Sequence, residues 1–236
     1  MRNLFNYDNI VFTIINKIVD CLFLSVLWIL FSIPLVTIGA SSAALYYTVN
    51  KVIIHSNGYV RKEFVKAFKS NFKQATIIWL LQAAVYYLLI TDCILMYSMY
   101  QAGSLPVVVF GVFVALGIAF AMWTFYMFPY ISRFQIGLKQ LMKNCLYLWI
   151  RHFFTSVILV SLFAGGVILF ITYPVSGLFL PAVYAVLING PLEKVFHRYM
   201  TEEDIKEEEG QNRKYCILLI LFILFQCFIV ISYFIE

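Results

Sequence analysis

Charged residues are scarce in this sequence. Asp, Glu, Lys and Arg make up 12% of its 236 residues, whereas hydrophobic residues make up 63% and the mean hydropathy is +0.88. A typical soluble domain is roughly 25% charged and about 45–50% apolar. A soluble chain of this composition would expose large apolar patches to water. The composition therefore excludes an ordinary soluble domain and predicts an integral membrane protein.

Motifs for common catalytic chemistry are also missing. The sequence contains no HExxH zinc motif, no GxSxG nucleophile elbow and no GxxxxGK[ST] phosphate-binding loop. Its three histidines lie near expected membrane boundaries, where we expect solvated imidazoles and no shared metal site. The five cysteines are scattered: Cys21, Cys93, Cys145, Cys216 and Cys227. We therefore predict that the protein is not an enzyme, holds no cofactor or metal, and keeps its thiols free.

Long apolar runs are abundant instead. Six of them can be distinguished, at residues 18–38, 75–97, 107–128, 153–172, 175–189 and 215–234. A helix needs about 20 apolar residues to cross the hydrocarbon core of a bilayer. We predict an all-α, polytopic transmembrane helical bundle of about six spans, with amphipathic helices at the cytoplasmic interface. Residues 1–9 are polar and lead directly into the first run, so we expect no cleaved signal peptide.

The basic residues occupy alternate connections between these runs. Fifteen of the seventeen lie between the first and second, third and fourth, or fifth and sixth runs: Lys51, Arg61, Lys62, Lys66, Lys69, Lys73, Arg133, Lys139, Lys143, Arg151, Lys194, Arg198, Lys206, Arg213 and Lys214. Lys and Arg are retained on the cytoplasmic side during insertion. We therefore predict three cytoplasmic connections, with both termini outside.

An amphipathic helix is predicted just before the second span. At about 100° per residue, Lys62, Lys66, Lys69 and Lys73 fall within one narrow arc. The opposite side carries three aromatic residues: Phe64, Phe68 and Phe72. We expect the cations to face anionic headgroups, the aromatics to enter the acyl boundary, and the chain to turn into the span near residue 75. Such a helix can serve only insertion and topology, or it can dock a partner protein. Lys139 and Lys143, one turn apart before the fourth span, repeat this arrangement.

Three stretches resemble a known family. The first, LWILFSIPLVTIGASSAALYYTVNKV (27–52), has Pro34 near the end of the first span and Gly39 where a helix can end, and Ser41 or Ser42 can cap a second helix. Together with FKSNFKQATIIWLL (68–81) and FPYISRFQIGLKQLMKN (128–144), it resembles the YesL family of bacterial membrane proteins, formerly a family of unknown function.

The resemblance implies a multi-pass protein of the bacterial cytoplasmic membrane, often encoded beside carbohydrate importers and polysaccharide-degrading enzymes. It supplies no catalytic residues. We expect residues 1–200 to form the YesL-like membrane domain, residues 201–214 an acidic cytoplasmic linker, and residues 215–236 a C-terminal transmembrane helix. The linker, with six acids between positions 202 and 209, can be a solvated spacer or can dock on a basic cytoplasmic surface.

Two features point to a transport path. Asp92 lies within the second span, where it can pair with Lys17 or another polar group, or form part of a site for a ligand or ion. The fifth run is short and contains Pro181, so it can line a substrate site or simply end early inside the bundle. Gln82 and Asn189 are expected to hydrogen-bond between helices, and glycines at 111, 117, 165 and 166 to allow close helix contact.

Three functional hypotheses follow. The first is a non-catalytic accessory subunit that contacts the permease subunits of a carbohydrate ABC importer through its cytoplasmic helices. The second is an independent transporter or channel for a small solute, and the third, an intramembrane enzyme, has almost no support from the residues. We favour the first, with Lys62, Lys66, Lys69, Lys73, Phe64, Phe68, Phe72, Lys139 and Lys143 as partner contacts. A homo-oligomer is compatible with either of the first two hypotheses. Nucleic acid is not an expected partner, because the basic residues are spread along membrane boundaries.

Overall fold

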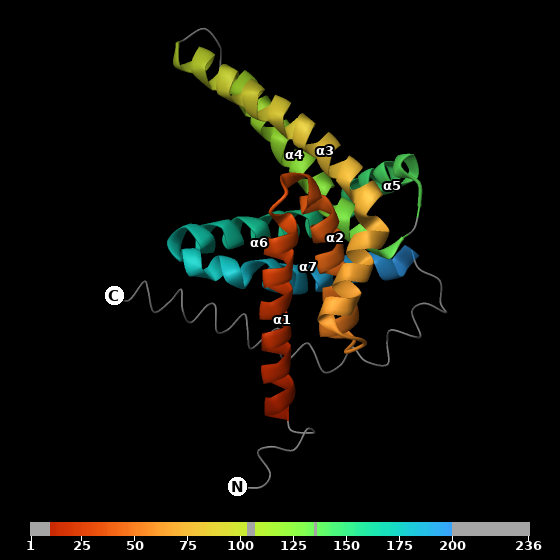
Figure 1. The fold of residues 1–236 in the computed structure, drawn as a ribbon. Helices are drawn as coiled ribbons and strands as arrows, with labels where there is room; N and C mark the ends of the chain where they lie inside the picture. Colours follow the sequence, from red (N-terminus) through yellow and green to blue (C-terminus); the bar gives the residue numbers. More distant parts are fainter. Residues whose placement is uncertain (1–9, 103–106, 135, 200–236) are drawn as a thin grey trace.

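The computed structural model describes residues 10–102, 107–134 and 136–199 (Figure 1). Within these ranges every regular element is a helix, so the chain is an all-α bundle. The main helices are α1 (Ile10–Ser32), α2 (Ile38–Thr48), α3 (Val60–Gln101), α4 (Val107–Arg133), α5 (Leu138–Arg151), α6 (Phe153–Thr172) and α7 (Leu180–Phe196). Short helices join them: η1 (Leu35–Thr37), the π-helix η2 (Val49–Ile54), η3 (Pro174–Leu178) and η4 (His197–Tyr199).

Four of the described helices are long and apolar enough to cross a membrane. These segments are Ile15–Ser32, Val60–Gln101, Val108–Arg133 and Phe153–Thr172. They leave many large apolar side chains exposed, including Leu88, Ile94, Val108 and Ile171. That surface suits a lipid bilayer, which confirms the predicted membrane character. The expected sixth span, at 215–234, lies outside the described residues.

The first span ends earlier than predicted. α1 stops at Ser32, just before Pro34, which cannot donate the hydrogen bond that a continuing helix needs. Thr37 tightens the turn by donating to the carbonyl oxygens of Phe31 and Pro34, at 2.6 and 2.7 Å. Thr37 also stands at the N-cap of α2, so the expected cap at Ser41 or Ser42 and the helix end at Gly39 are both wrong.

The short helix α2 forms the centre of the molecule (Figure 1). It packs against α1, α3, α4 and α7. Most of its residues are buried: Gly39, Ala40, Ser41, Ala43, Ala44, Leu45, Tyr46 and Thr48. Small side chains let the neighbours approach closely; a Cβ added at Gly39 would lie 2.6 Å from the Ala75 carbonyl oxygen. The stretch expected to be an interfacial connection is therefore partly the core.

The amphipathic segment and the second span form one uninterrupted helix. α3 runs for 42 residues, about 63 Å, with no turn near Ala75. No Gly or Pro occurs between Val60 and Gln101, so nothing in the sequence forces a break. Its first half packs against α2, and its second half pairs with α4 in a projecting hairpin (Figure 1).

The second hairpin consists of α6 and α7. Pro181 stands in the first turn of α7, where proline is well tolerated, so it starts this helix and does not interrupt it. The helix also continues through Pro191 to Phe196. The predicted fifth segment, 175–189, is thus divided between η3 and α7, and the division falls just before Pro181. With 17 residues, α7 is not among the candidate spans.

The expected close glycine contacts are largely absent. A Cβ added at Gly111, Gly117 or Gly165 would meet nothing within 4 Å, and one at Gly166 would meet only Leu180. Gly111 and Gly165 are exposed, whereas Gly117 and Gly166 are half-buried.

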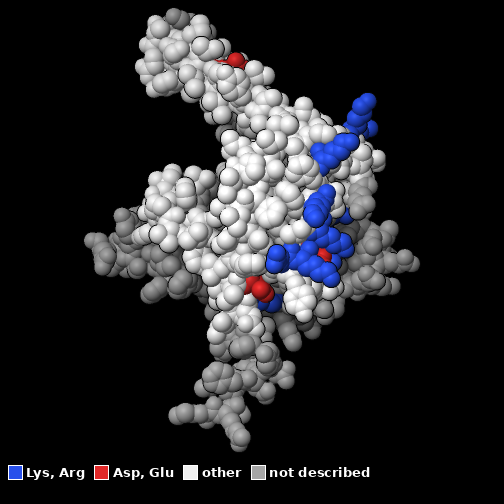
Figure 2. All heavy atoms as spheres, viewed as in Figure 1, with Lys and Arg blue, Asp and Glu red and all other residues white. Residues whose placement is uncertain are grey.

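The charged residues are concentrated outside the two hairpins. Figure 2 shows Lys and Arg gathered in a band on one side of the molecule, away from the projecting α3–α4 hairpin. Between residues 74 and 132 the only charged residue is Asp92, and residues 152–192 contain none. The two hairpins are therefore the apolar part of the molecule, and the first half of α3, α5 and the end of α7 carry its cations.

Candidate functional site: a buried charged centre and an exposed lysine face

A buried carboxylate connects three helices. Glu193 on α7 accepts a hydrogen bond of 2.9 Å from the Tyr46 hydroxyl on α2 and one of 2.7 Å from the Arg133 guanidinium at the end of α4. The side chains of Arg133 and Glu193 are only 12% and 11% exposed. His197, one turn after Glu193, places Nε2 3.6 Å from the same carboxylate. Burying a lone charge is costly, so this carboxylate depends on its partners.

This charged centre was not predicted from the sequence. Arg133 and Glu193 are 60 residues apart, and each lies near an expected membrane boundary, where a solvated charge is the usual interpretation. One signal was available: Glu193 is the only acidic residue between Asp92 and Glu202. His197 also follows it at a spacing of four, which places both on one helix face.

A second ion pair fixes the start of α3. Lys51 on η2 donates to Glu63 at 2.8 Å and lies over the ring of Tyr47. The hydrogen bond to the Glu63 carboxylate raises the pKa of Lys51. This pair ties the π-helix that follows α2 to the first turn of α3, across the connection at residues 55–59.

Two buried amides lie one turn from the Tyr46–Glu193 contact. Asn50 follows Tyr46 by four residues on η2, and Asn189 precedes Glu193 by four residues on α7. Both side chains are at most 4% exposed, and both amide nitrogens lack a hydrogen-bond partner among the described residues. Helices η2 and α7 pack against each other. The predicted interhelical bond of Asn189 is therefore not made by its amide nitrogen, whereas Gln82 does donate across to Met127 on α4.

The lysines predicted to bind a partner form one exposed face. Lys62, Lys66, Lys69 and Lys73 are all exposed on the first half of α3, on the side of the molecule where Figure 2 shows the cations. No ion pair joins any of these four to an acid among the described residues. We call them the lysine face.

The aromatic residues opposite the lysine face do not share one environment. Phe64 is fully buried, with its ring 5.4 Å from that of Phe31 on α1, and Phe68 lies 4.9 Å from the same ring. Only Phe72 is largely exposed, at 41%. The expectation that all three enter the acyl boundary is wrong for Phe64 and Phe68, because α1 and α2 cover them. Phe64 and Phe68 therefore pack the side of α3 opposite the lysine face against the rest of the bundle.

Lys139 and Lys143 lie on a separate helix. Both are exposed on α5, whose opposite side buries Leu141, Cys145 and Leu148. The amide of Gln74 donates to the Ile136 carbonyl oxygen, which links α3 to the connection before α5. The structure thus places the two predicted basic helices on one connected part of the bundle.

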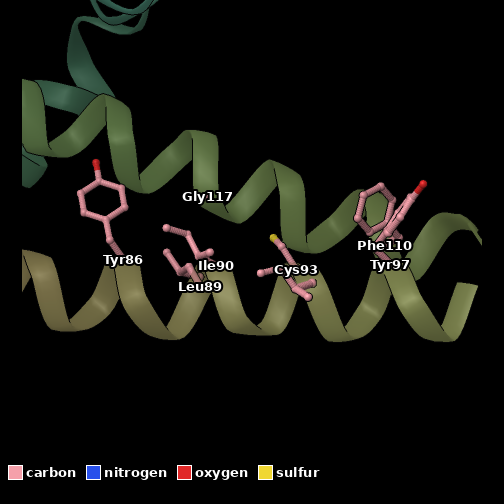
Figure 3. A pocket seen from close by; sticks show the side chains of 8 residues that line it. Tyr86, Leu89, Ile90, Cys93, Tyr97, Phe110 and Gly117 are labelled. Atoms are coloured by element: carbon pink, nitrogen blue, oxygen red, sulfur yellow. The ribbon is translucent and has the colours of Figure 1, made fainter.

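Asp92 is separated from the charged centre. It lies on the outer half of α3, and Lys17 instead donates to the Ile53 carbonyl before that helix begins. The nearby groove between α3 and α4 has a volume of about 450 Å³ and an apolar lining (Figure 3). Its lining residues are Tyr86, Leu89, Ile90, Cys93, Ile94, Tyr97, Phe110 and Gly117. Asp92 is not among them, so this groove is not the ligand or ion site that was one of the two alternatives for Asp92.

The described ranges do not meet the requirements of a metal site. No group of three His, Cys, Asp or Glu side chains there could hold a metal ion. Cys21, Cys93 and Cys145 are free thiols. The buried charges of the described chain are instead used to join helices.

The fold and these sites define a helical membrane protein with a buried ionic centre and one cationic side. A family model described as "Protein of unknown function, DUF624" matches residues 21–93. This region contains most of α1, all of α2 and the lysine face. Neither the curated proteins nor the solved structures give a match.

Proposed function

We propose that this chain is a YesL-like accessory subunit of the bacterial cytoplasmic membrane, which has no catalytic role of its own and docks on the permease subunits of a carbohydrate ABC importer. The family match over residues 21–93 supports the resemblance. The importer as partner rests on the gene neighbourhood that the resemblance implies.

The lysine face is the observation that carries this proposal. Four exposed lysines, which have no acidic partner within residues 10–102, 107–134 and 136–199, lie on a helix whose opposite side is packed through Phe64 and Phe68. A rigid row of like charges repels itself, and it is stabilised when an acidic surface covers it. Anionic headgroups can also neutralise such a row, but a second basic helix, α5, follows a connection that Gln74 ties to α3 through the Ile136 carbonyl oxygen. An acidic cytoplasmic surface on a membrane complex would complement both the lysine face and α5.

The test is purification of the tagged full-length chain from its native membrane in mild detergent, followed by quantitative mass spectrometry. The variant K66E/K69E/K73E should lose copurifying permease subunits by at least about tenfold, because each reversed charge turns attraction into repulsion. The matched control is R151E/K194E/R198E, which reverses the same number of exposed cations outside the lysine face, at the last residue of α5, on α7 and on η4. Equal capture by both variants would contradict the proposal, provided that both insert with the wild-type topology.

A transporter remains the second candidate, and the buried centre is the observation that favours it. Glu193 lies near the buried amide nitrogens of Asn50 and Asn189, which have no hydrogen-bond partner in the described part of the chain. Sheltered polar groups of this kind can bind solutes within a bundle. Under this alternative the purified protein carries no partner. A panel of sugars should then include one that raises its melting temperature, and Asn50→Ala and Asn189→Ala should abolish that shift. Copurification of a permease without any sugar-dependent shift would favour the accessory subunit.

A further inference from the structure

We propose that the acidic segment 202–209 of this same chain docks on the lysine face and covers it until a partner displaces it. The displacement step rests on the proposed function; the docking itself does not. No acidic side chain among the described residues pairs with the lysine face, and the sequence contains one strongly acidic segment just beyond their end.

Charge balance is the first argument. The described residues contain thirteen Lys and Arg but only four acids: Asp20, Glu63, Asp92 and Glu193. Glu63 and Glu193 are already paired with Lys51 and Arg133, and Asp92 lies on the outer half of α3. Asp20 lies near Lys17 on α1. None of these acids reaches the lysine face, whereas residues 202–209 bring six acids and one lysine.

The place where the described chain ends is the second argument. Helix η4 ends at Tyr199, whose hydroxyl lies 3.3 Å from Nε2 of His152 and whose ring contacts Tyr147 on α5. Phe196, just before η4, belongs to the core cluster against which Phe68 packs from α3. The acidic segment therefore begins six residues after Phe196, which shares a core with the helix carrying the lysine face.

Length is the third argument. From Lys62 to Lys73 the helix rises about 17 Å. The eight residues 202–209 span up to about 25 Å when extended, so they can follow the whole row. The lysines fall within roughly 60° of arc, which gives one straight track for an extended acidic chain. The predicted topology places both elements on the cytoplasmic side.

The acidic segment would therefore compete with a partner for the lysine face. The segment is tethered, so its effective concentration at the lysine face is high, and a partner must exceed it in acidity or in contact area. Exposed ion pairs are individually weak and screened by salt, so the segment is displaceable. We expect partner binding to free the segment and salt to release it.

Zero-length carbodiimide cross-linking of the full-length protein tests the docking without any partner. Equal amounts of light and isotopically heavy chains are mixed, so that links within one chain can be told from links between chains. We expect links from residues 202–209 to Lys66, Lys69 or Lys73 within one chain. These links should fall about fivefold at high salt, as expected for exposed ion pairs.

Charge exchange supplies the decisive variant. K66E/K69E/K73E should lose the links, and adding E207K/E208K/E209K should restore them with the amine and carboxylate exchanged. A second measurement does not depend on folding of the altered helix: in E207Q/E208Q/E209Q, acetylation of Lys66 and Lys69 should quicken about fivefold, while Lys139 is unchanged.

Three outcomes would overturn the docking: links only to Lys139 or Lys143, links only between chains, or lysine reactivity that responds to anionic lipid and not to the acidic segment. Partner capture separates this inference from the proposed function. Docking without any captured partner would leave the inference standing and remove the function, whereas a captured partner without docking would do the reverse.

Discussion

Tyr46 donates a hydrogen bond to Glu193, 147 residues further along the chain, and this bond joins the central helix α2 to α7. Arg133 completes the contact from α4. The three helices thus meet at one carboxylate inside a bundle that otherwise presents apolar surface to lipid. The charged centre joins α2, α4 and α7, and α2 in turn packs against the helix that carries the lysine face.

Removing the buried carboxylate should destabilise the bundle. In Glu193→Gln, Arg133 keeps its charge in a buried place without a counter-charge, so we expect the free energy of unfolding to fall by about 3 kcal/mol. The double variant Glu193→Gln with Arg133→Gln should recover part of this loss. Unfolding in detergent–denaturant mixtures measures the free energy of each variant. A double variant whose loss of unfolding free energy equals or exceeds the sum of the two single losses would contradict the pairing.

Gly39 should tolerate no larger residue. A Cβ there would lie 2.6 Å from the Ala75 carbonyl oxygen and 2.7 Å from Cβ of Trp79, neither of which can move without shifting α3. We expect Gly39→Ala to lower the free energy of unfolding by about 2 kcal/mol. Gly117→Ala is the matched control, because nothing lies within 4 Å of its added Cβ. That control should be neutral or slightly stabilising.

The two aromatic residues Phe64 and Phe72 should differ sharply. Phe64 on α3 is fully buried and packs against Phe31 on α1, so Phe64→Ala should cost about 4 kcal/mol of unfolding free energy. Phe72 is 41% exposed, and Phe72→Ala should cost less than about 1 kcal/mol. Thermal unfolding of the two variants in the same detergent gives the comparison. Similar losses would show that Phe64 does not pack inside the bundle.

His152 should make stability depend on pH. Burial, reinforced by Arg198 and Arg151, lowers the pKa of its imidazole below the usual 6.5. As pH falls through 6.5 the unfolded chain therefore takes up a proton that the folded protein resists, and the stability contributed by the neutral ring is lost until pH reaches the folded pKa. His152→Gln should flatten this part of the profile of melting temperature against pH. An unchanged slope would contradict this role of His152.

The membrane helices could be predicted because lipid makes each span locally self-sufficient. Apolar length and the alternation of Lys and Arg were enough to locate the hairpins, whose tips carry no basic residue. Three described spans, at 75–97, 107–128 and 153–172, fall inside helices of the structure. The orientation of the termini stays a prediction.

The core of the bundle could not be predicted in the same way. Helix α2 consists largely of Gly, Ala and Ser, with apolar character on no particular side, so its burial depends on what packs around it. The partners of Glu193 come from 60 and 147 residues away. The length of α3 was missed because a change from charged to apolar residues looks like a boundary, although the backbone itself is uninterrupted.

The lysine face was predicted from helical spacing alone, and the structure confirms that its four lysines are exposed on one helix. What the spacing could not tell is that Phe64 and Phe68 face protein. A hydrophobic stripe on such a helix suits lipid and a neighbouring helix equally well, and only the position of α1 decides between them.

The most direct test of the account is the protein composition of complexes purified in mild detergent with the wild-type chain, K66E/K69E/K73E and R151E/K194E/R198E. We expect stoichiometric sugar-permease subunits with the wild type and the R151E/K194E/R198E control, and their loss with K66E/K69E/K73E. A wild-type chain that purifies alone or only with itself would contradict the accessory-subunit function.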